Sequence, residues 1–161
     1  MRWFPAILLL GATLGCEPPP DVEPLACRKA APGEAELGAG DLATGFIPLE
    51  DGEEVPVVFG PQGMHMIVVS IQVDDLEAAE VGSLGNHVQV AMVLEGEVVG
   101  GTVIDMEPMA NGDLSEFLGL RAVFTVAEIQ EVIGEVIEVE GAVVDGCGRE
   151  LETSRWVTLV E

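Results

Sequence analysis

The sequence predicts an all-β domain, an antiparallel β-sandwich of about seven to nine strands, with a small β-barrel as the alternative. Valine is frequent and the apolar runs are short, and this combination favours strands over helices. The chain has 161 residues, and its 20 glycines and 10 prolines separate the apolar runs. Short strands at regular spacing are typical of both sandwiches and small barrels.

Alternation of apolar and polar residues is clearest in residues 64–73 and 135–144. Side chains in a strand point alternately to its two faces, so Glu138 and Glu140 are expected on the solvent side of the strand at residues 135–144. The other expected strands are residues 46–49, 55–59, 88–94, 97–99, 103–106, 119–126 and 155–160. Residues 127–133 have the one helical pattern, of one or two turns.

The first residues have the pattern of an export signal. Arg2 precedes an apolar run at residues 6–14, which is shorter than the ~20 residues of a membrane-spanning helix. The run ends in Thr-Leu-Gly-Cys16, which resembles a bacterial lipobox with its leucine one position late. The resemblance implies a signal peptide over residues 1–15, lipid on Cys16, and attachment to the bilayer of a bacterial envelope, on the periplasmic or outer face of the outer membrane. The alternative is an ordinary secretory signal that is cleaved elsewhere.

Residues 16–41 are rich in proline, glycine, alanine and glutamate and predict a tether, which leaves residues 42–161 for the domain. The three cysteines are Cys16, Cys27 and Cys147. If Cys16 carries lipid, an exported protein would join Cys27 to Cys147 in a disulfide. A metal pair and two free thiols are the alternatives.

The charge excludes two classes of partner. Lys and Arg total 6 and Asp and Glu total 29, so the net charge is −23. Binding nucleic acid through its phosphates needs clustered cations, and so does electrostatic docking to anionic lipid. The 48% hydrophobic content is far from that of disordered acidic chains. The acids either coat a soluble surface or dock a basic protein, and a concentrated patch would favour docking.

Metal ligation has two candidates. Met64, His65 and Met66 carry groups that suit copper, but in a strand the two methionines would face away from the histidine. Acidic clusters at residues 51–54, 74–77 and 105–107 could attract calcium, but none has the spacing of a calcium-binding loop.

Catalytic motifs are not found. The chain has no nucleophile elbow, zinc-protease helix, P-loop or dinucleotide fingerprint. With no tyrosine and only Trp3 and Trp156, it also offers little aromatic surface for a sugar. We therefore expect no enzymatic activity and no cofactor.

Two short motifs resemble uncharacterised lipoproteins of delta-proteobacterial and myxobacterial type. These motifs are Gly-Pro-Gln-Gly-Met-His at residues 60–65, before an apolar strand, and Asp-Gly-Cys-Gly-Arg at residues 145–149. The resemblance implies an immunoglobulin-like domain over residues 42–161 and an envelope location, and it implies no chemistry. The expected function is a non-enzymatic, lipid-anchored envelope protein that binds a protein or has a structural role. The alternative is a periplasmic protein that binds copper or calcium.

Overall fold

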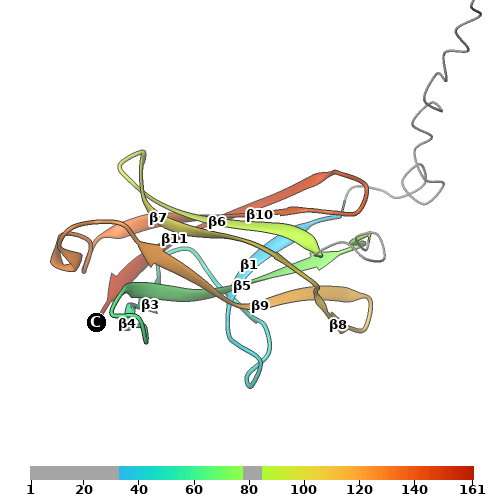
Figure 1. Cartoon of the computed structure of the whole chain (residues 1–161), viewed down its shortest axis with the longest axis horizontal. Coiled ribbons are helices and arrows are strands. Elements are labelled where there is room, and N and C mark those ends of the chain that lie inside the picture. The colour runs from blue at the N-terminus through green and yellow to red at the C-terminus, as the bar shows by residue number, and fades with distance from the viewer. Residues whose placement is uncertain (1–32, 78–84) are drawn as a thin grey trace, which may run out of the picture.

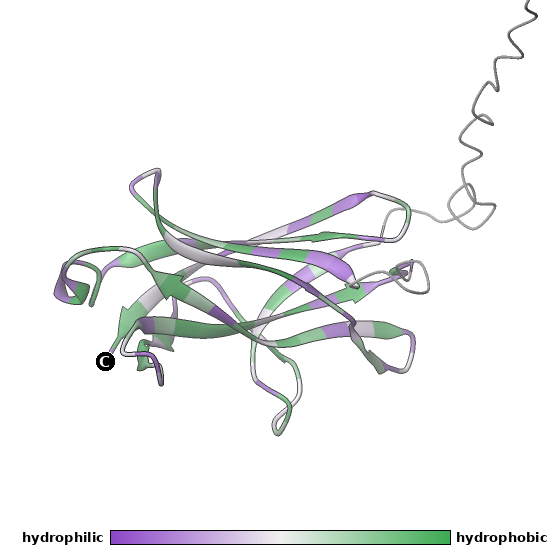
Figure 2. Cartoon of the chain, in the orientation of Figure 1, coloured by the Kyte–Doolittle hydropathy of each residue, from purple (hydrophilic) through white to green (hydrophobic). Residues whose placement is uncertain are grey.

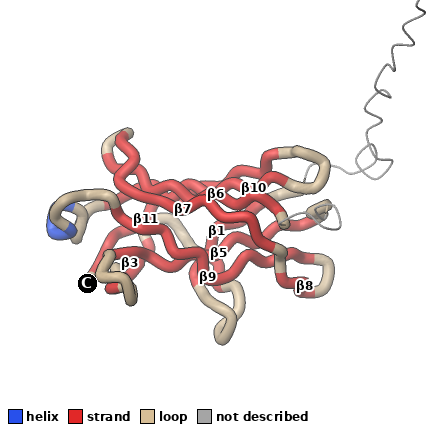
Figure 3. The backbone as a smooth tube through the Cα atoms, viewed as in Figure 1, coloured by secondary structure: helices blue, strands red, loops and turns tan. Residues whose placement is uncertain are grey.

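The computed structural model describes residues 33–77 and 85–161, and within these ranges the chain is all-β, as the sequence predicts. Its strands are β1 (Ala35–Ala39), β2 (Ile47–Pro48), β3 (Glu53–Pro56), β4 (Val58–Phe59), β5 (His65–Asp74), β6 (Asn86–Leu94), β7 (Glu97–Met106), β8 (Met109–Asn111), β9 (Leu114–Phe124), β10 (Val136–Val144) and β11 (Glu150–Val160). Figure 3 shows that strands make up most of the backbone. In the described ranges the only helix is a 3-10 turn, η1 (Ile129–Glu131), where one or two helical turns are expected.

The two strands with the clearest alternation are confirmed. In β5 the expected inward residues from Ile67 to Val73 are fully buried, and in β10 the buried residues alternate with Glu138 and Glu140. Other boundaries differ. β7 is one strand where two are expected, β9 and β11 begin five residues earlier than expected, and β8 is additional.

The first strand lies in the segment that the sequence assigns to the tether. Residues Ala35–Ala39 form β1, which pairs antiparallel with β5 and buries Leu37 completely. The segment has no β-branched residue, so its local preference gives no sign of a strand. Pairing with β5 decides its conformation, which is the usual dominance of sheet context over β propensity.

The described strands form one curled, mostly antiparallel sheet in the order β2-β1-β5-β9-β7-β6-β10-β11-β3, with β4 on β5 and β8 on β9. The sheet folds over, so that β6, β7, β10 and β11 lie above β5, β8 and β9 (Figure 1). Two residue pairs join β7 to β9, Gly100 with Phe124 and Gly101 with Val123. The immunoglobulin-like sandwich is therefore not confirmed, and a continuous curled sheet fits the small-barrel alternative.

The hydrophobic core fills the space between the two layers. Figure 2 shows hydrophobic residues along most of β5, the central strand of the lower layer. Gly141 of β10 faces β5 and β1 across the core. A Cβ atom at this position would lie 2.9 Å from Ile71 Cδ1 and 3.3 Å from Leu37 Cδ1, and 3.2 Å from Thr153 Cγ2 on the neighbouring strand. The absence of a side chain at Gly141 is what allows the layers to approach.

The segment between β2 and β3 links the two margins of the sheet. Leu49 is buried, and its N–H donates to the Leu37 carbonyl of β1 over 3.2 Å. Its carbonyl accepts a hydrogen bond from Arg155 Nε of β11 over 3.0 Å. Arg155 Nη2 also lies 3.9 Å from the Glu36 carboxylate of β1. One residue thus connects both margins, and β3 continues from it to pair in parallel with β11.

Asp145 organises the turn between β10 and β11. Its carboxylate accepts hydrogen bonds from the backbone N–H groups of Cys147 and Arg149 over 2.8 and 2.9 Å. Its other oxygen lies 2.7 Å from Arg149 Nε and 2.5 Å from Arg149 Nη2. The Asp145 side chain is fully buried. A buried carboxylate is tolerated because four donors replace its hydration.

We predict that Gly141→Ala lowers the free energy of unfolding by about 1–3 kcal/mol, because the added methyl group overpacks the core against Ile71. Urea denaturation measures this loss. Ala142→Ser, at the neighbouring position on the solvent side, is the control and should change the free energy by no more than about 0.5 kcal/mol. Equal effects from both substitutions would contradict the close approach.

We also predict that Asp145→Ala costs about 3 kcal/mol of stability, because it removes the buried carboxylate that accepts from two backbone N–H groups of the turn and pairs with Arg149. The measurement is again urea denaturation. Asp113→Ala, in the exposed turn between β8 and β9, is the matched control and should have little effect. A loss at Asp145 as small as that at Asp113 would mean that the turn does not depend on this ion pair.

Candidate functional site

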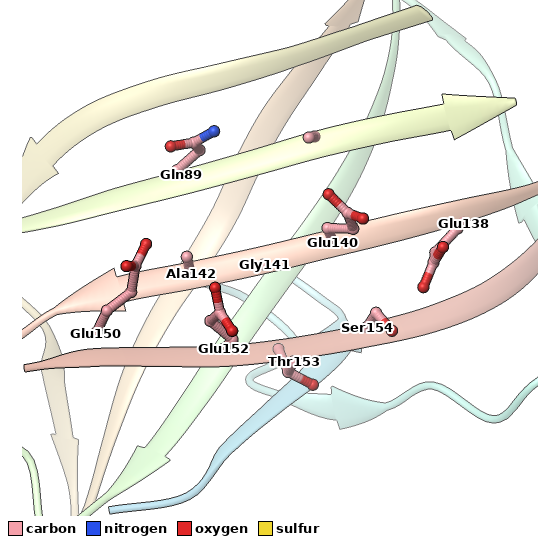
Figure 4. A pocket seen from close by; sticks show the side chains of 10 residues that line it. Gln89, Glu138, Glu140, Gly141, Ala142, Glu150, Glu152, Thr153 and Ser154 are labelled. Carbon is pink, nitrogen blue, oxygen red and sulfur yellow. The ribbon is translucent and has the colours of Figure 1, made fainter. Parts of the chain in front are cut away.

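A hollow with a volume of about 470 Å³ lies on the solvent face of β6, β10 and β11. It is lined by Gln89, Ala91, Glu138, Glu140, Gly141, Ala142, Glu150, Glu152, Thr153 and Ser154. Figure 4 shows the four glutamates along β10 and β11, around Gly141 and Ala142. We call this surface, with Glu138, Glu140, Glu150 and Glu152, the acidic face.

The register of three strands explains the hollow. Glu140 of β10 lies between Ala91 of β6 and Ser154 of β11, and Ala142 lies between Gln89 and Glu152. Small side chains therefore alternate with longer ones across the face, because Ala91 and Ser154 flank Glu140 and the small Ala142 lies between Gln89 and Glu152. The result is a shallow depression with a small-residue floor and carboxylates around it.

The electrostatics of the acidic face are one-sided. No lysine or arginine is among the residues that line the hollow, whereas four glutamates are. Glu152 lies diagonally across from Glu140, because Glu140 pairs with Ser154 two positions further along β11. Diagonal neighbours of this kind lie about 7–8 Å apart, a distance at which like charges still repel each other. A bound cationic group would relieve this repulsion.

An exposed tryptophan extends the acidic face. Trp156 of β11 pairs with Glu138 of β10 and so lies on the same side of the sheet. Its side chain is large and apolar, yet the residue is 47% exposed. The backbone N–H of Trp156 donates to Asp51 Oδ1 over 2.9 Å, which fixes the strand at this point. The faces of tryptophan rings attract cations, and tryptophan is enriched among the residues that dominate binding energy.

A histidine–aspartate pair lies further along the same side. Nδ1 of His87 in β6 is 2.8 Å from Oδ1 of Asp105 in β7, and these residues are cross-strand partners. Both side chains are about half exposed. The pair joins the two strands locally and leaves Asp105 at the outer edge of β7.

The residues predicted as copper ligands do not converge. Met64 and Met66 line one small hollow beside Arg121, and His65 lines a different one with Phe59. The His65 ring makes an edge contact with the Phe59 ring at a centroid distance of 5.2 Å. The alternation that the sequence predicts for these three residues is therefore confirmed, and they do not form one ligand set.

The acidic clusters considered for calcium have structural contacts. Asp51 accepts the Trp156 N–H, a Glu53 oxygen accepts the Glu50 N–H, and Asp74 Oδ1 accepts the Glu34 N–H. Across residues 33–77 and 85–161, no group of three or more His, Cys, Asp and Glu side chains could hold a metal ion.

Of the predicted cysteine sites, Cys16 and Cys27 lie outside the described residues. Cys147 lies in the turn between β10 and β11, at the end of the domain where the described chain begins, and opposite the C-terminus (Figure 1). Lipidation of Cys16 and the Cys27–Cys147 disulfide stay predictions. No helix in the described part of the chain has the length and apolar character needed to cross a bilayer.

The sequence predicts two of the four glutamates of the acidic face. The alternation in residues 135–144 places Glu138 and Glu140 outward. Glu150 and Glu152 are missed, because the last strand is expected to begin only at residue 155. The alternation that would predict a strand here is present, since the apolar Leu151 lies between two glutamates. It is short and directly follows a glycine-rich turn, so these residues are easily assigned to the turn.

Comparison with known proteins identifies no relative of this chain, so a function can be argued only from its own residues. No protein-family model matches the chain, and no match was found among curated proteins or among solved structures. The resemblance to uncharacterised lipoproteins stays an expectation from two short motifs.

Proposed function

We propose that this chain is a non-enzymatic, lipid-anchored envelope protein whose β-domain binds a positively charged protein on the acidic face. The observation that supports it is the concentration of four glutamates around one hollow, next to an exposed tryptophan. The lining of this hollow has four glutamates and no lysine or arginine, and this one-sided charge favours the docking of a basic protein.

The geometry of the acidic face favours a protein partner over a small ligand. The hollow is shallow and open, and its floor is made of Gly141, Ala91 and Ala142. Small-molecule sites are usually enclosed and mostly apolar. A strand or loop with lysine or arginine side chains could place its cations between the glutamates and one of them over Trp156. Charge complementarity of this kind mainly gives specificity and speed of association.

The proposed anchor and the proposed docking surface are compatible. Lipid on Cys16 would hold the protein at the bilayer without help from surface charge, because each buried CH₂ group contributes about 0.8 kcal/mol. The tether would join the domain at the end where Gly33 lies. Anionic lipid headgroups would repel the acidic face, which would turn the face toward the aqueous side. The surface would then be accessible to a protein in the envelope.

The anchor is tested by cell fractionation. We expect Cys16→Ala to move the protein from the membrane fraction to the soluble fraction, because the substitution removes the acylated thiol. Cys27→Ala is the matched control and should stay with the membrane. Mass spectrometry of the purified N-terminus would show the acyl groups. A Cys16→Ala protein that remains membrane-bound would contradict the proposal.

Docking is tested by photo-crosslinking in intact cells from a photoreactive residue at Gln89, which is exposed beside the hollow. We expect a discrete adduct, and we expect it to disappear when Glu138, Glu140, Glu150 and Glu152 are all changed to glutamine. The same label at Gln62, in a turn outside the acidic face, should give no such adduct.

A charge-matched variant completes that experiment. It changes four glutamates outside the acidic face to glutamine, namely Glu50, Glu54, Glu128 and Glu131, and should keep the adduct. If the adduct survives loss of the acidic face, or is lost equally in both variants, the face is not the docking surface.

A further inference from the structure

Within residues 33–77 and 85–161, the outer edge of β7 has no strand partner over half of its length. β7 pairs with β6 from Glu97 to Met106, but with β9 only at Gly100 and Gly101. Beyond these glycines, no described strand pairs with the other side of residues 102–106. Figure 1 shows β7 and β9 running apart between these glycines and the connection to β8. Among the residues that the structure describes, the backbone N–H and C=O groups of this side therefore have no strand partner, and an edge of this kind can pair with another chain.

The two glycines explain why the strands separate. A Cβ atom at Gly100 would lie 2.3 Å from the Val123 carbonyl oxygen of β9, and one at Gly101 would lie 2.4 Å from the Val90 carbonyl oxygen of β6. The backbones of β7 and β9 thus come close enough to pair at this point. From Thr102 onward β7 carries side chains and follows β6 alone.

An inward-facing side chain is left uncovered along this edge. Ile104 pairs with Val88 of β6, and cross-strand partners lie on the same face of a sheet. Val88 is fully buried in the core, yet Ile104 is 45% exposed, and Val103 on the opposite face is 59% exposed. An added strand with an apolar inner face would cover Ile104.

The edge has little protection against strand addition. Natural edge strands are usually guarded by lysine, proline or a bulge. Residues 102–106 read Thr-Val-Ile-Asp-Met, with neither lysine nor proline, and the register shift between β6 and β7 lies near Met92 and Val93, away from these residues. Asp105 is the only charged residue among residues 102–106, and Glu107 is the first residue after this range.

We infer that residues Thr102–Met106 are a strand-addition site for an extended, basic segment of a partner protein. This inference rests on the proposed binding function and specifies how the partner is held. The extended backbone of the segment completes the hydrogen bonds of β7, and its apolar side chains lie on the inner face and cover Ile104. Its cationic side chains face Asp105 and Glu107.

Charge favours this occupant over a second copy of the chain. Two copies paired edge to edge would bring together two Asp105 carboxylates on proteins that each carry a net charge of −23. A lysine- or arginine-bearing segment is attracted instead, and the acidic face of the same layer adds to that attraction.

The test uses a fluorescent eight-residue peptide of alternating valine and lysine, titrated by anisotropy into the full-length chain. The control peptide has the same sequence with alternate backbone nitrogens methylated, so it keeps the charge but loses edge hydrogen bonds. We expect the control to bind at least tenfold more weakly. We also expect hydrogen exchange of the amides in residues 102–106 to slow at least tenfold with the first peptide.

Two substitutions with the same charge change locate the binding. Ile104→Lys should weaken binding of the unmethylated peptide at least tenfold, because it places a cation at the edge and removes the apolar contact. Val98→Lys, exposed on the same strand before the glycines, should leave binding within about twofold of the original affinity.

The outcomes separate this inference from the proposed function. Equal binding of both peptides, or unchanged exchange at residues 102–106, overturns strand addition and leaves docking on the acidic face untouched. A dimer that dissociates with Ile104→Lys overturns the basic partner in favour of a second copy. If the variant with four glutamines loses the cellular crosslink but still binds the unmethylated peptide at the edge of β7, both docking on the acidic face and strand addition are supported.

Discussion

The close approach of three strands at Gly100 and Gly101 is the constraint on which the rest of the structure depends. It is where the upper and lower layers become one sheet, because β7 pairs with β9 nowhere else. Carbonyl oxygens on both sides occupy the space that side chains would need. The same contact ends the pairing, so the curl of the sheet and the unpaired edge of β7 have one cause.

The sequence predicts most of the strands but not how they pair. Alternation is a local property, and where it is long, as in β5 and β10, the buried residues follow from it directly. Whether strands form two sheets or one depends on contacts between distant residues, such as Gly101 with Val123. The strand at Ala35–Ala39 shows the same limit, since only its pairing with β5 distinguishes it from a tether.

The acidic face shows which part of a surface site is accessible from sequence. The outward direction of Glu138 and Glu140 follows from period two, but their closeness to Glu152 depends on the register between β10 and β11. The hollow itself depends on Ala91, from a third strand. Small residues at the centre of a sheet face leave no signal until the register is known. The failure of Met64, His65 and Met66 to form one metal site could be predicted from the sequence alone, because adjacent residues in a strand point to opposite faces.

The connection from Leu37 through Leu49 to Arg155 bears on when this protein can fold. The hydrogen bond between Leu49 and Arg155 spans 106 positions, and that between Asp51 and Trp156 spans 105. Contacts so distant in sequence form slowly, because the loop between them must first be closed. Early segments such as β3 have no strand partner until β11 is present. If the chain is exported, this topology would help keep it unfolded during passage and would delay completion of the sheet until its last strand has crossed.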